Sequence, residues 1–144
     1  MDRDLRRLFS EYLTKFKTMA VATSSKDGIP DCATVYYAVG EDGRIYFATA
    51  DTTVKYKNLR ANPNVALSFT DDGVSSTGLQ IRGTAAEVQS KMVAAATRTL
   101  LKQRDARIAA FVDRPDVVIF EVMPSERFLI NFAWGVDWRN AVPG

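Results

Sequence analysis

The sequence has no histidine and a single cysteine, Cys32. Without histidine the chain lacks the base of Ser-His-Asp and Cys-His catalysis, the histidine ligand of haem proteins and every histidine-containing metal site. One cysteine cannot form an internal disulfide, which fits the reducing cytoplasm where we expect the protein to act. The acidic residues form no cluster with metal-ligand spacing, so no metal site is expected. Demanding chemistry would therefore have to come from a bound cofactor.

Long apolar runs and a strong excess of one charge are also missing. The apolar runs are short and interrupted, so no membrane span is expected, and no apolar stretch near the N-terminus indicates a signal peptide. The net charge of +2 is too small to indicate nucleic-acid binding. The chain has 144 residues, of which 47% are hydrophobic and 25% charged. These values predict a single globular domain, residues 1–144, with a substantial core.

Hydrophobic periodicity predicts a helix followed by a strand meander in the first half of the chain. Apolar side chains recur at helical spacing over residues 3–16. Alternating and β-branched residues then predict strands over 18–23, 31–39 and 44–49. Tight turns join these strands, one of them at Asp27-Gly28, so we expect the strands to be antiparallel.

The second half mixes helices with further strands. A short helix should begin near Val54 and stop near Asn62-Pro63. Residues 90–112 should be helical in two pieces, broken around Arg104-Asp105, and Gly83 should mark a bulge or barrel corner. Further strands are expected over 65–70, 79–88, 116–122 (ended by Pro124) and 127–132. The pattern predicts an α+β fold, a small antiparallel barrel of six to seven strands with flanking helices.

A group of hydroxyls and one lysine stands where the third strand gives way to the short helix. Thr49 ends the strand, Thr52 and Thr53 follow in the loop, and Lys55 enters the helix. Unpaired N–H groups and the dipole at a helix N-terminus favour anions, and Lys and Thr side chains donate to phosphate oxygens. The pattern is consistent with a phosphate site. It is also what an ordinary Thr N-cap followed by a solvated lysine would give.

The stretch from Ile45 to Phe69 resembles the FMN-binding split-barrel family, whose fold is that of pyridoxamine 5′-phosphate oxidase. The matching pieces are Phe47-Ala48-Thr49, Thr53, Lys55, Asn58-Leu59 and Asn62-Pro63. The similarity covers about residues 15–90. It implies a split β-barrel that forms a homodimer, with FMN held at the interface between the subunits.

The resemblance also implies roles for individual residues. Thr53 and Lys55 would contact the FMN phosphate, with Thr49 nearby, and the hydroxyl of Thr52 in the same loop is a further candidate from the pattern above. The remaining implied contacts are the strand Ala33, Thr34, Val35 and Tyr36 beside the ring system and Gln80 at the ribityl chain or ring. Trp134, in an aromatic tail, would serve either as an aromatic wall near the flavin or as core or dimer packing.

The sequence departs from pyridoxamine phosphate oxidases at their substrate site. Those enzymes place an Arg and a Lys on the second strand, where this chain has Ala33 and Ala38, and they use a C-terminal Arg-Leu-His segment that it lacks. We therefore predict an FMN-dependent oxidoreductase that acts on another small molecule, with no catalytic side chain identified. A non-catalytic flavin-binding or electron-transfer protein and a deazaflavin-dependent reductase remain as alternatives.

Overall fold

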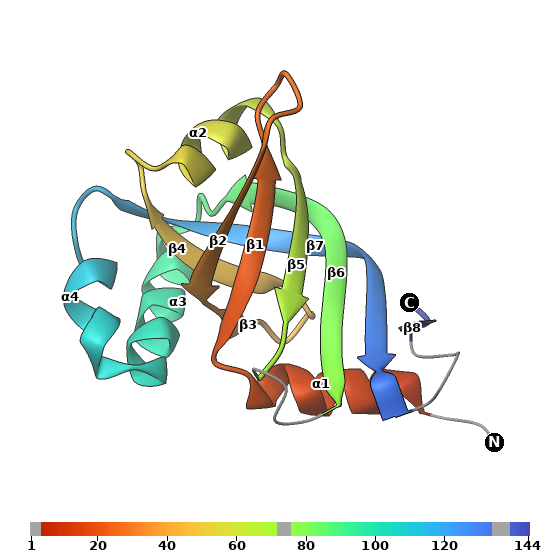
Figure 1. Cartoon of the computed structure of the whole chain (residues 1–144). Helices are drawn as coiled ribbons and strands as arrows, with labels where there is room; N and C mark the ends of the chain where they lie inside the picture. The colour runs from red at the N-terminus through yellow and green to blue at the C-terminus, as the bar shows by residue number, and fades with distance from the viewer. Residues whose placement is uncertain (1–3, 72–75, 134–138) are drawn as a thin grey trace.

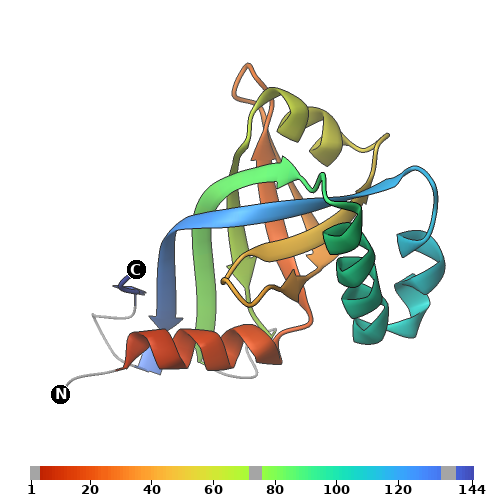
Figure 2. The same cartoon turned by 180° about the vertical axis from the view of Figure 1, so that it is seen from behind.

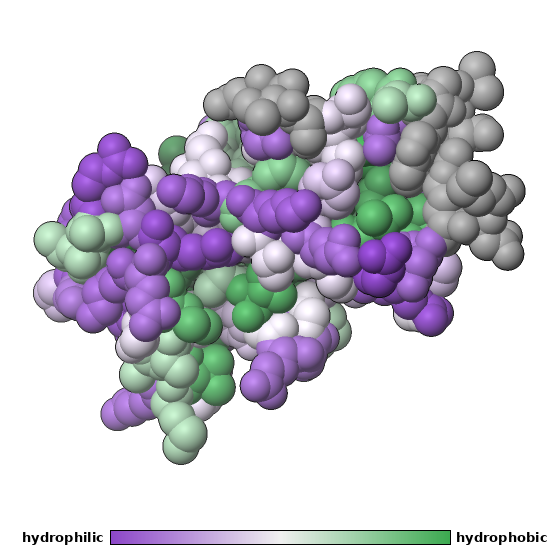
Figure 3. Space-filling model, turned by 90° about the horizontal axis from the view of Figure 1, so that it is seen from below, coloured by the Kyte–Doolittle hydropathy of each residue, from purple (hydrophilic) through white to green (hydrophobic). Residues whose placement is uncertain are grey.

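The computed structural model describes residues 4–71, 76–133 and 139–144 and shows one curled antiparallel sheet with helices around it (Figures 1 and 2). Helix α1 (Leu5–Lys15) begins at Asp4, whose side chain accepts a hydrogen bond from the N–H of Arg7 at 3.1 Å. It buries Phe9 and Leu13 beneath the sheet, and hydrophilic side chains run across the face seen from below (Figure 3). The amphipathic helix predicted from the sequence is confirmed.

The described residues form a sheet of eight strands, which confirms the α+β split barrel with one strand more than the predicted range. The first four are β1 (Thr18–Ser24), β2 (Pro30–Tyr36), β3 (Ala38–Val39) and β4 (Ile45–Ala50). The strand order is β2-β1-β5-β6-β7-β4-β3, with β8 paired to β7. Strands β2 and β3 follow one another in sequence but lie at opposite ends of this order, so the barrel is split between them.

The prediction of one strand over residues 31–39 is wrong, because the chain leaves the ladder at Tyr37. This side chain is fully buried, and its hydroxyl lies within hydrogen-bonding distance of the carbonyl oxygens of Leu13 and Phe16. A buried hydroxyl needs a hydrogen-bond partner, and Tyr37 finds it here rather than in the ladder with β1. The next residues, Ala38 and Val39, then pair with β4 as β3.

The remaining elements are α2 (Val54–Ala61), β5 (Asn64–Phe69), β6 (Thr77–Glu87), α3 (Lys91–Arg104), the 3-10 helix η1 (Ala106–Ile108), α4 (Ala109–Val112), β7 (Val117–Asn131) and β8 (Arg139–Ala141). The predicted break at Arg104-Asp105 is confirmed, since Asp105 has an extended backbone between α3 and η1. None of the described helices is both long enough and apolar enough to cross a membrane.

Strand β7 corrects a second boundary, because Pro124 does not end it. The register of β6 with β7 shifts between Arg82 and Gly83, and Ser125 is the extra residue of the bulge. Proline needs no ladder partner for its missing N–H at such a position. The bulge predicted from Gly83 is confirmed, and the two expected strands are one bent strand that spans the barrel (Figure 1).

The buried apolar residues form two separate clusters. The larger fills the barrel and includes Val21, Phe47, Leu67 and Leu129. The smaller lies under α3 and α4 and consists of Ala38, Leu101, Val112 and Ile119, with partly buried neighbours such as Phe111. The helical segment 91–112, which we call the cap, is therefore anchored by apolar packing to the β3, β4 and β7 side of the barrel.

Candidate functional site

A cavity of about 300 Å³ lies where the barrel is split, and we call it the split cavity. One wall is β2, the opposite wall is β4, and the cap lies over both. Its lining residues are Thr34, Val35, Tyr36, Ala48, Lys55, Leu101, Ile108, Phe111 and Val112. Small-molecule sites typically have this character, with apolar walls and a few polar groups.

The β2 wall offers main-chain hydrogen bonds as well as side chains. Strand β2 is the end of the sheet order and pairs only with β1 within the sheet. The N–H and C=O groups on the other edge of such a strand have no ladder partner. The structure places Thr34, Val35 and Tyr36 along the split cavity, whereas Ala33 packs against the barrel core. Their contact with a flavin ring stays a prediction.

Among the described residues, Lys55 is the one cation that lines the split cavity, at the end nearest the start of α2. The side chain is half-buried, and its ammonium makes no hydrogen bond or ion pair with any residue that the structure describes. Burial lowers the pKa of Lys55, and the carboxylate of Asp31 offsets this only in part. A partly desolvated positive charge without a close counter-ion, beside a helix N-terminus, is suited to an anionic ligand.

The three threonines stand beside the cavity but do not line it. Thr53 is the N-cap of α2, with its Oγ1 3.2 Å from the N–H of Tyr56 and 3.0 Å from the carbonyl oxygen of Ala50. Thr49 is buried, and its Oγ1 lies 2.7 Å from that of Thr53. Each hydroxyl has one proton to donate. When Thr53 donates to the carbonyl oxygen of Ala50, Thr49 must be the donor in the hydrogen bond between the two threonines. Thr52 is exposed in the preceding turn. The capping role is confirmed for Thr53, and the phosphate contacts stay a prediction.

Gln80 lies on a different surface. It lines a cavity of about 270 Å³ on the outer face of the sheet, together with Ser68, Phe128 and Arg139. This cavity shares no lining residue with the split cavity. Within one subunit Gln80 therefore does not meet the other predicted site residues. Trp134 lies outside the described residues.

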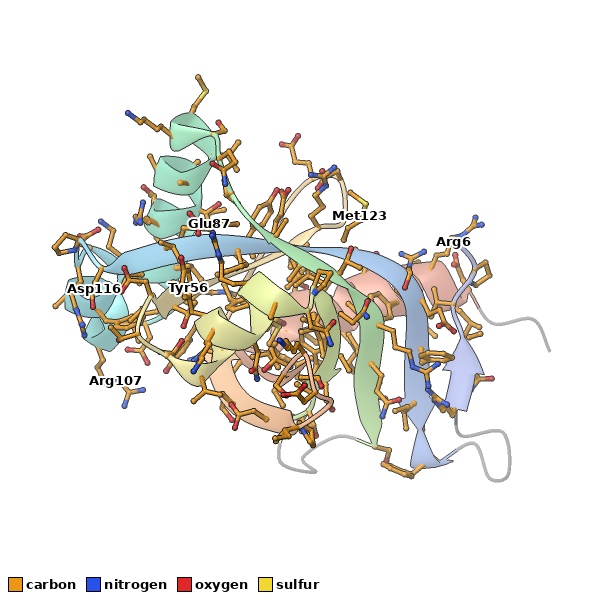
Figure 4. The ribbon with its side chains drawn as sticks, turned by 90° about the horizontal axis from the view of Figure 1, so that it is seen from above. Arg6, Tyr56, Glu87, Arg107, Asp116 and Met123 are labelled. Carbon is orange, nitrogen blue, oxygen red and sulfur yellow. The ribbon has the colours of Figure 1, made fainter. Side chains whose placement is uncertain are left out.

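A polar cluster joins the cap to the rim of the split cavity. The hydroxyl of Tyr36 donates to Oδ2 of Asp105 at 2.8 Å, and the guanidinium of Arg107 pairs with the same carboxylate at 2.5 Å. Arg107, helped by the Tyr36 hydroxyl, lowers the pKa of Asp105, while the hydrogen bond to Asp105 raises the pKa of Tyr36. The phenol therefore stays protonated and the carboxylate charged. Arg107 itself lies at the outer edge of the molecule (Figure 4).

Sequence reasoning missed the contribution of the cap. Leu101, Ile108 and Phe111 were part of a helical segment whose apolar spacing did not distinguish a cavity lining from ordinary core packing. Asp105 was located at a helix break, but nothing in the sequence indicated that its partner is Tyr36, 69 residues away.

The sequence matches the family model described as "Pyridoxamine 5′-phosphate oxidase" over residues 5–131. No curated protein matches the sequence.

Solved structures share the fold at low sequence identity. The heme binding protein from Mycobacterium smegmatis superposes with a TM-score of 0.81 at 15% identity, over 98% of this chain and 58% of its own. HutZ, the heme storage protein from Vibrio cholerae, gives a TM-score of 0.73 at 18% identity over 90% and 95% of the two chains. The General Stress Protein 26 from Bacillus anthracis str. Sterne gives 0.72 at 18% identity over 89% and 95%. This chain thus spans a little over half of the M. smegmatis protein.

Proposed function

The chain belongs to the pyridoxamine 5′-phosphate oxidase family, and on that basis we propose that it is a flavoprotein that binds FMN in the split cavity. The observation that carries the proposal is the half-buried ammonium of Lys55, which has no ion-pair partner among the described residues and lines a cavity bounded by an edge strand. The phosphate of FMN would supply the missing negative charge.

The other parts of the split cavity fit the rest of the cofactor. The free edge of β2 at Thr34 and Val35 can pair with the polar edge of a flavin ring. Ala48 and the apolar side chains of the cap can contact its faces. When bound, the flavin would supply the redox chemistry, and this chain would bind and orient it and exclude water. Titration of FMN and riboflavin into the wild type and Lys55→Ala tests this assignment.

The haem-binding neighbours raise haem as another cofactor of this fold. The chain contains no histidine, which is the axial ligand of many haem proteins. The propionates of haem are anions too, so Lys55 could pair with either cofactor, and it is the absence of histidine that leads us to retain FMN. A deazaflavin coenzyme, which also carries anionic groups, remains the alternative ligand.

We propose an oxidoreductase rather than a flavin carrier, with the chemistry supplied by the flavin and the substrate a small molecule. In the part of the chain that the structure describes, Tyr36 and Lys55 are the only titratable side chains that line the split cavity, and the lining is otherwise mostly apolar. Neither side chain is placed as a general acid or base. The test is steady-state turnover of the FMN-loaded protein with small-molecule reductants and acceptors. An oxidoreductase should turn over, and a flavin carrier or electron-transfer protein should not.

Formation of a homodimer is the first expected outcome. The cavity around Gln80 on the outer sheet face has small side chains on its strands, among them Ala20, Ala22 and Ala66, so a second copy of the chain can approach the sheet closely there. Gln80 could then reach the flavin of the partner subunit. Light scattering at micromolar concentration should give twice the mass of the chain.

Ala66→Arg, on this face, should shift the protein to the monomer because the added charge would be buried. Ala95→Arg on the exposed side of α3 should not. A monomeric wild type, or equal masses for the two variants, would contradict an interface at this face.

Pyridoxamine 5′-phosphate is not expected to be oxidised efficiently. Ala33 packs toward the barrel core and Ala38 is buried under the cap, so neither position presents a cation to the split cavity. The assay measures oxidation of this compound by the FMN-loaded protein. Turnover in the range usual for enzymes, about 1–1000 per second, would show that the missing cations do not matter.

A further inference from the structure

The cap is held to the two sides of the split in different ways. On the β4 side it shares the smaller apolar cluster with Ala38 and Ile119. On the β2 side, Tyr36 is the one described strand residue that packs against this cluster, and it is only partly buried. Two hydrogen bonds also link the cap to the described residues 30–37, from Tyr36 to Asp105 at 2.8 Å and from Nε of Arg104 to the carbonyl oxygen of Tyr37 at 2.9 Å. The β2 side thus combines less shared apolar burial with polar contacts near the surface, so it is where the cap separates most easily.

Asp105 lies between α3 and η1, and its carboxylate accepts hydrogen bonds from both Arg107 and Tyr36. Its Oδ1 accepts from the N–H of Arg107 at 2.9 Å, which caps η1, and its Oδ2 accepts from Tyr36. Its side chain is only 15% exposed, whereas that of Arg107 is 84% exposed. The carboxylate is thus fixed in place between α3 and η1 and faces the strand rather than solvent.

We propose that Asp105 is a positioning residue that acts through Tyr36. It ties the cap to β2 across the split, so that a ligand in the split cavity is enclosed between the two. The identity of the ligand rests on the proposed function, whereas the tie itself does not. Tyr36 lines the cavity from β2, and Ile108 and Phe111, which come after Asp105 in the cap, line it from the other side. Loss of the tie should therefore loosen both walls of the cavity.

Two variants remove the tie from opposite ends. Tyr36→Phe keeps the ring and removes the donor hydroxyl. Asp105→Ser keeps a side chain that can cap η1 but is too short to reach Tyr36. Asp116→Ser is the matched control, because Asp116 forms a similar pair with Arg114 at 2.5 Å and does not line the split cavity.

The first measurement is amide hydrogen exchange over residues 104–112, which needs no ligand. Tyr36→Phe and Asp105→Ser should both speed exchange in this segment, and Asp116→Ser should not. The second is the rate at which FMN dissociates after dilution. Both variants should raise this rate about three- to tenfold, since a hydrogen bond to a charged group near the surface is worth a modest amount. The double variant should release FMN no faster than Asp105→Ser alone, because the hydrogen bond that Tyr36→Phe removes is already lost in Asp105→Ser.

If the rate of amide hydrogen exchange over residues 104–112 is unchanged in both single variants, the Tyr36–Asp105 hydrogen bond does not tie the cap to β2. Faster exchange with an unaltered FMN dissociation rate would overturn the positioning role. A protein that binds no FMN but shows the expected exchange would refute the proposed ligand while supporting the tie. Additive effects in the double variant would show that Asp105 does not act through Tyr36.

Discussion

Replacing Gly83 by alanine is expected to lower the free energy of unfolding by about 3 kcal/mol or more. A Cβ at this position would lie 2.3 Å from the carbonyl oxygen of Met123, and also close to the backbone of Pro124. These are main-chain atoms of the neighbouring strand, so they cannot rotate away as a side chain would. The added methyl group must push β6 and β7 apart at their bulge, in the longest strand pairing of the barrel.

Gly78→Ala provides the control on the same strand. A Cβ there would lie 3.1 Å from the carbonyl oxygen of Phe69, a contact that a small shift relieves. Urea denaturation of the two variants should show a large loss of stability for Gly83→Ala and a clearly smaller one for Gly78→Ala. Equal midpoints for Gly83→Ala and the wild type would mean that the strands are not closely packed at the bulge.

Replacing Lys55 by alanine should weaken FMN binding by about 1.5–3 kcal/mol, or roughly ten- to a hundredfold. The phosphate loses hydration on binding, and this loss must be offset by donors and positive charge. Among the described residues that line the split cavity, no other cation could take the place of Lys55. Riboflavin lacks the phosphate, so its affinity should change much less. Titrations of both flavins against both proteins measure the difference.

Lys57→Ala is the control, because Lys57 lies on the same helix but lines a different groove. It should leave the affinity for FMN close to that of the wild type. If Lys55→Ala binds FMN as tightly as the wild type does, Lys55 is not part of the phosphate site. Equal losses for FMN and riboflavin would indicate a distorted cavity rather than a lost charge interaction.

The sequence predicted most elements of the fold because local signals and tertiary packing agree there. The apolar spacing of α1, the turn glycines and the bulge at Gly83 are each visible over a few residues. The break at Tyr37 was not visible, since its neighbours favour strands on both sides. Its cause is a hydrogen bond to α1, which only the folded chain provides. The continuity of β7 through Pro124 likewise depends on the bulge opposite Gly83.

For the site, the sequence predicted one side of the cavity. Lys55 and the β2 residues were expected, and the structure brings Thr34, Val35, Tyr36 and Lys55 together. The cap was missed because its apolar residues have the same spacing as buried helix residues elsewhere. Gln80 lies on another face, and its predicted role depends on a second copy of the chain.

The measurement that tests the central claim most directly is identification of the ligand that the protein carries after purification. The absorption spectrum of the protein is recorded, the ligand is released by heat, and its mass is determined. The account predicts the two visible bands of an oxidised flavin and the mass of FMN. Haem or a deazaflavin coenzyme in the released fraction, with no FMN binding on titration, would contradict it.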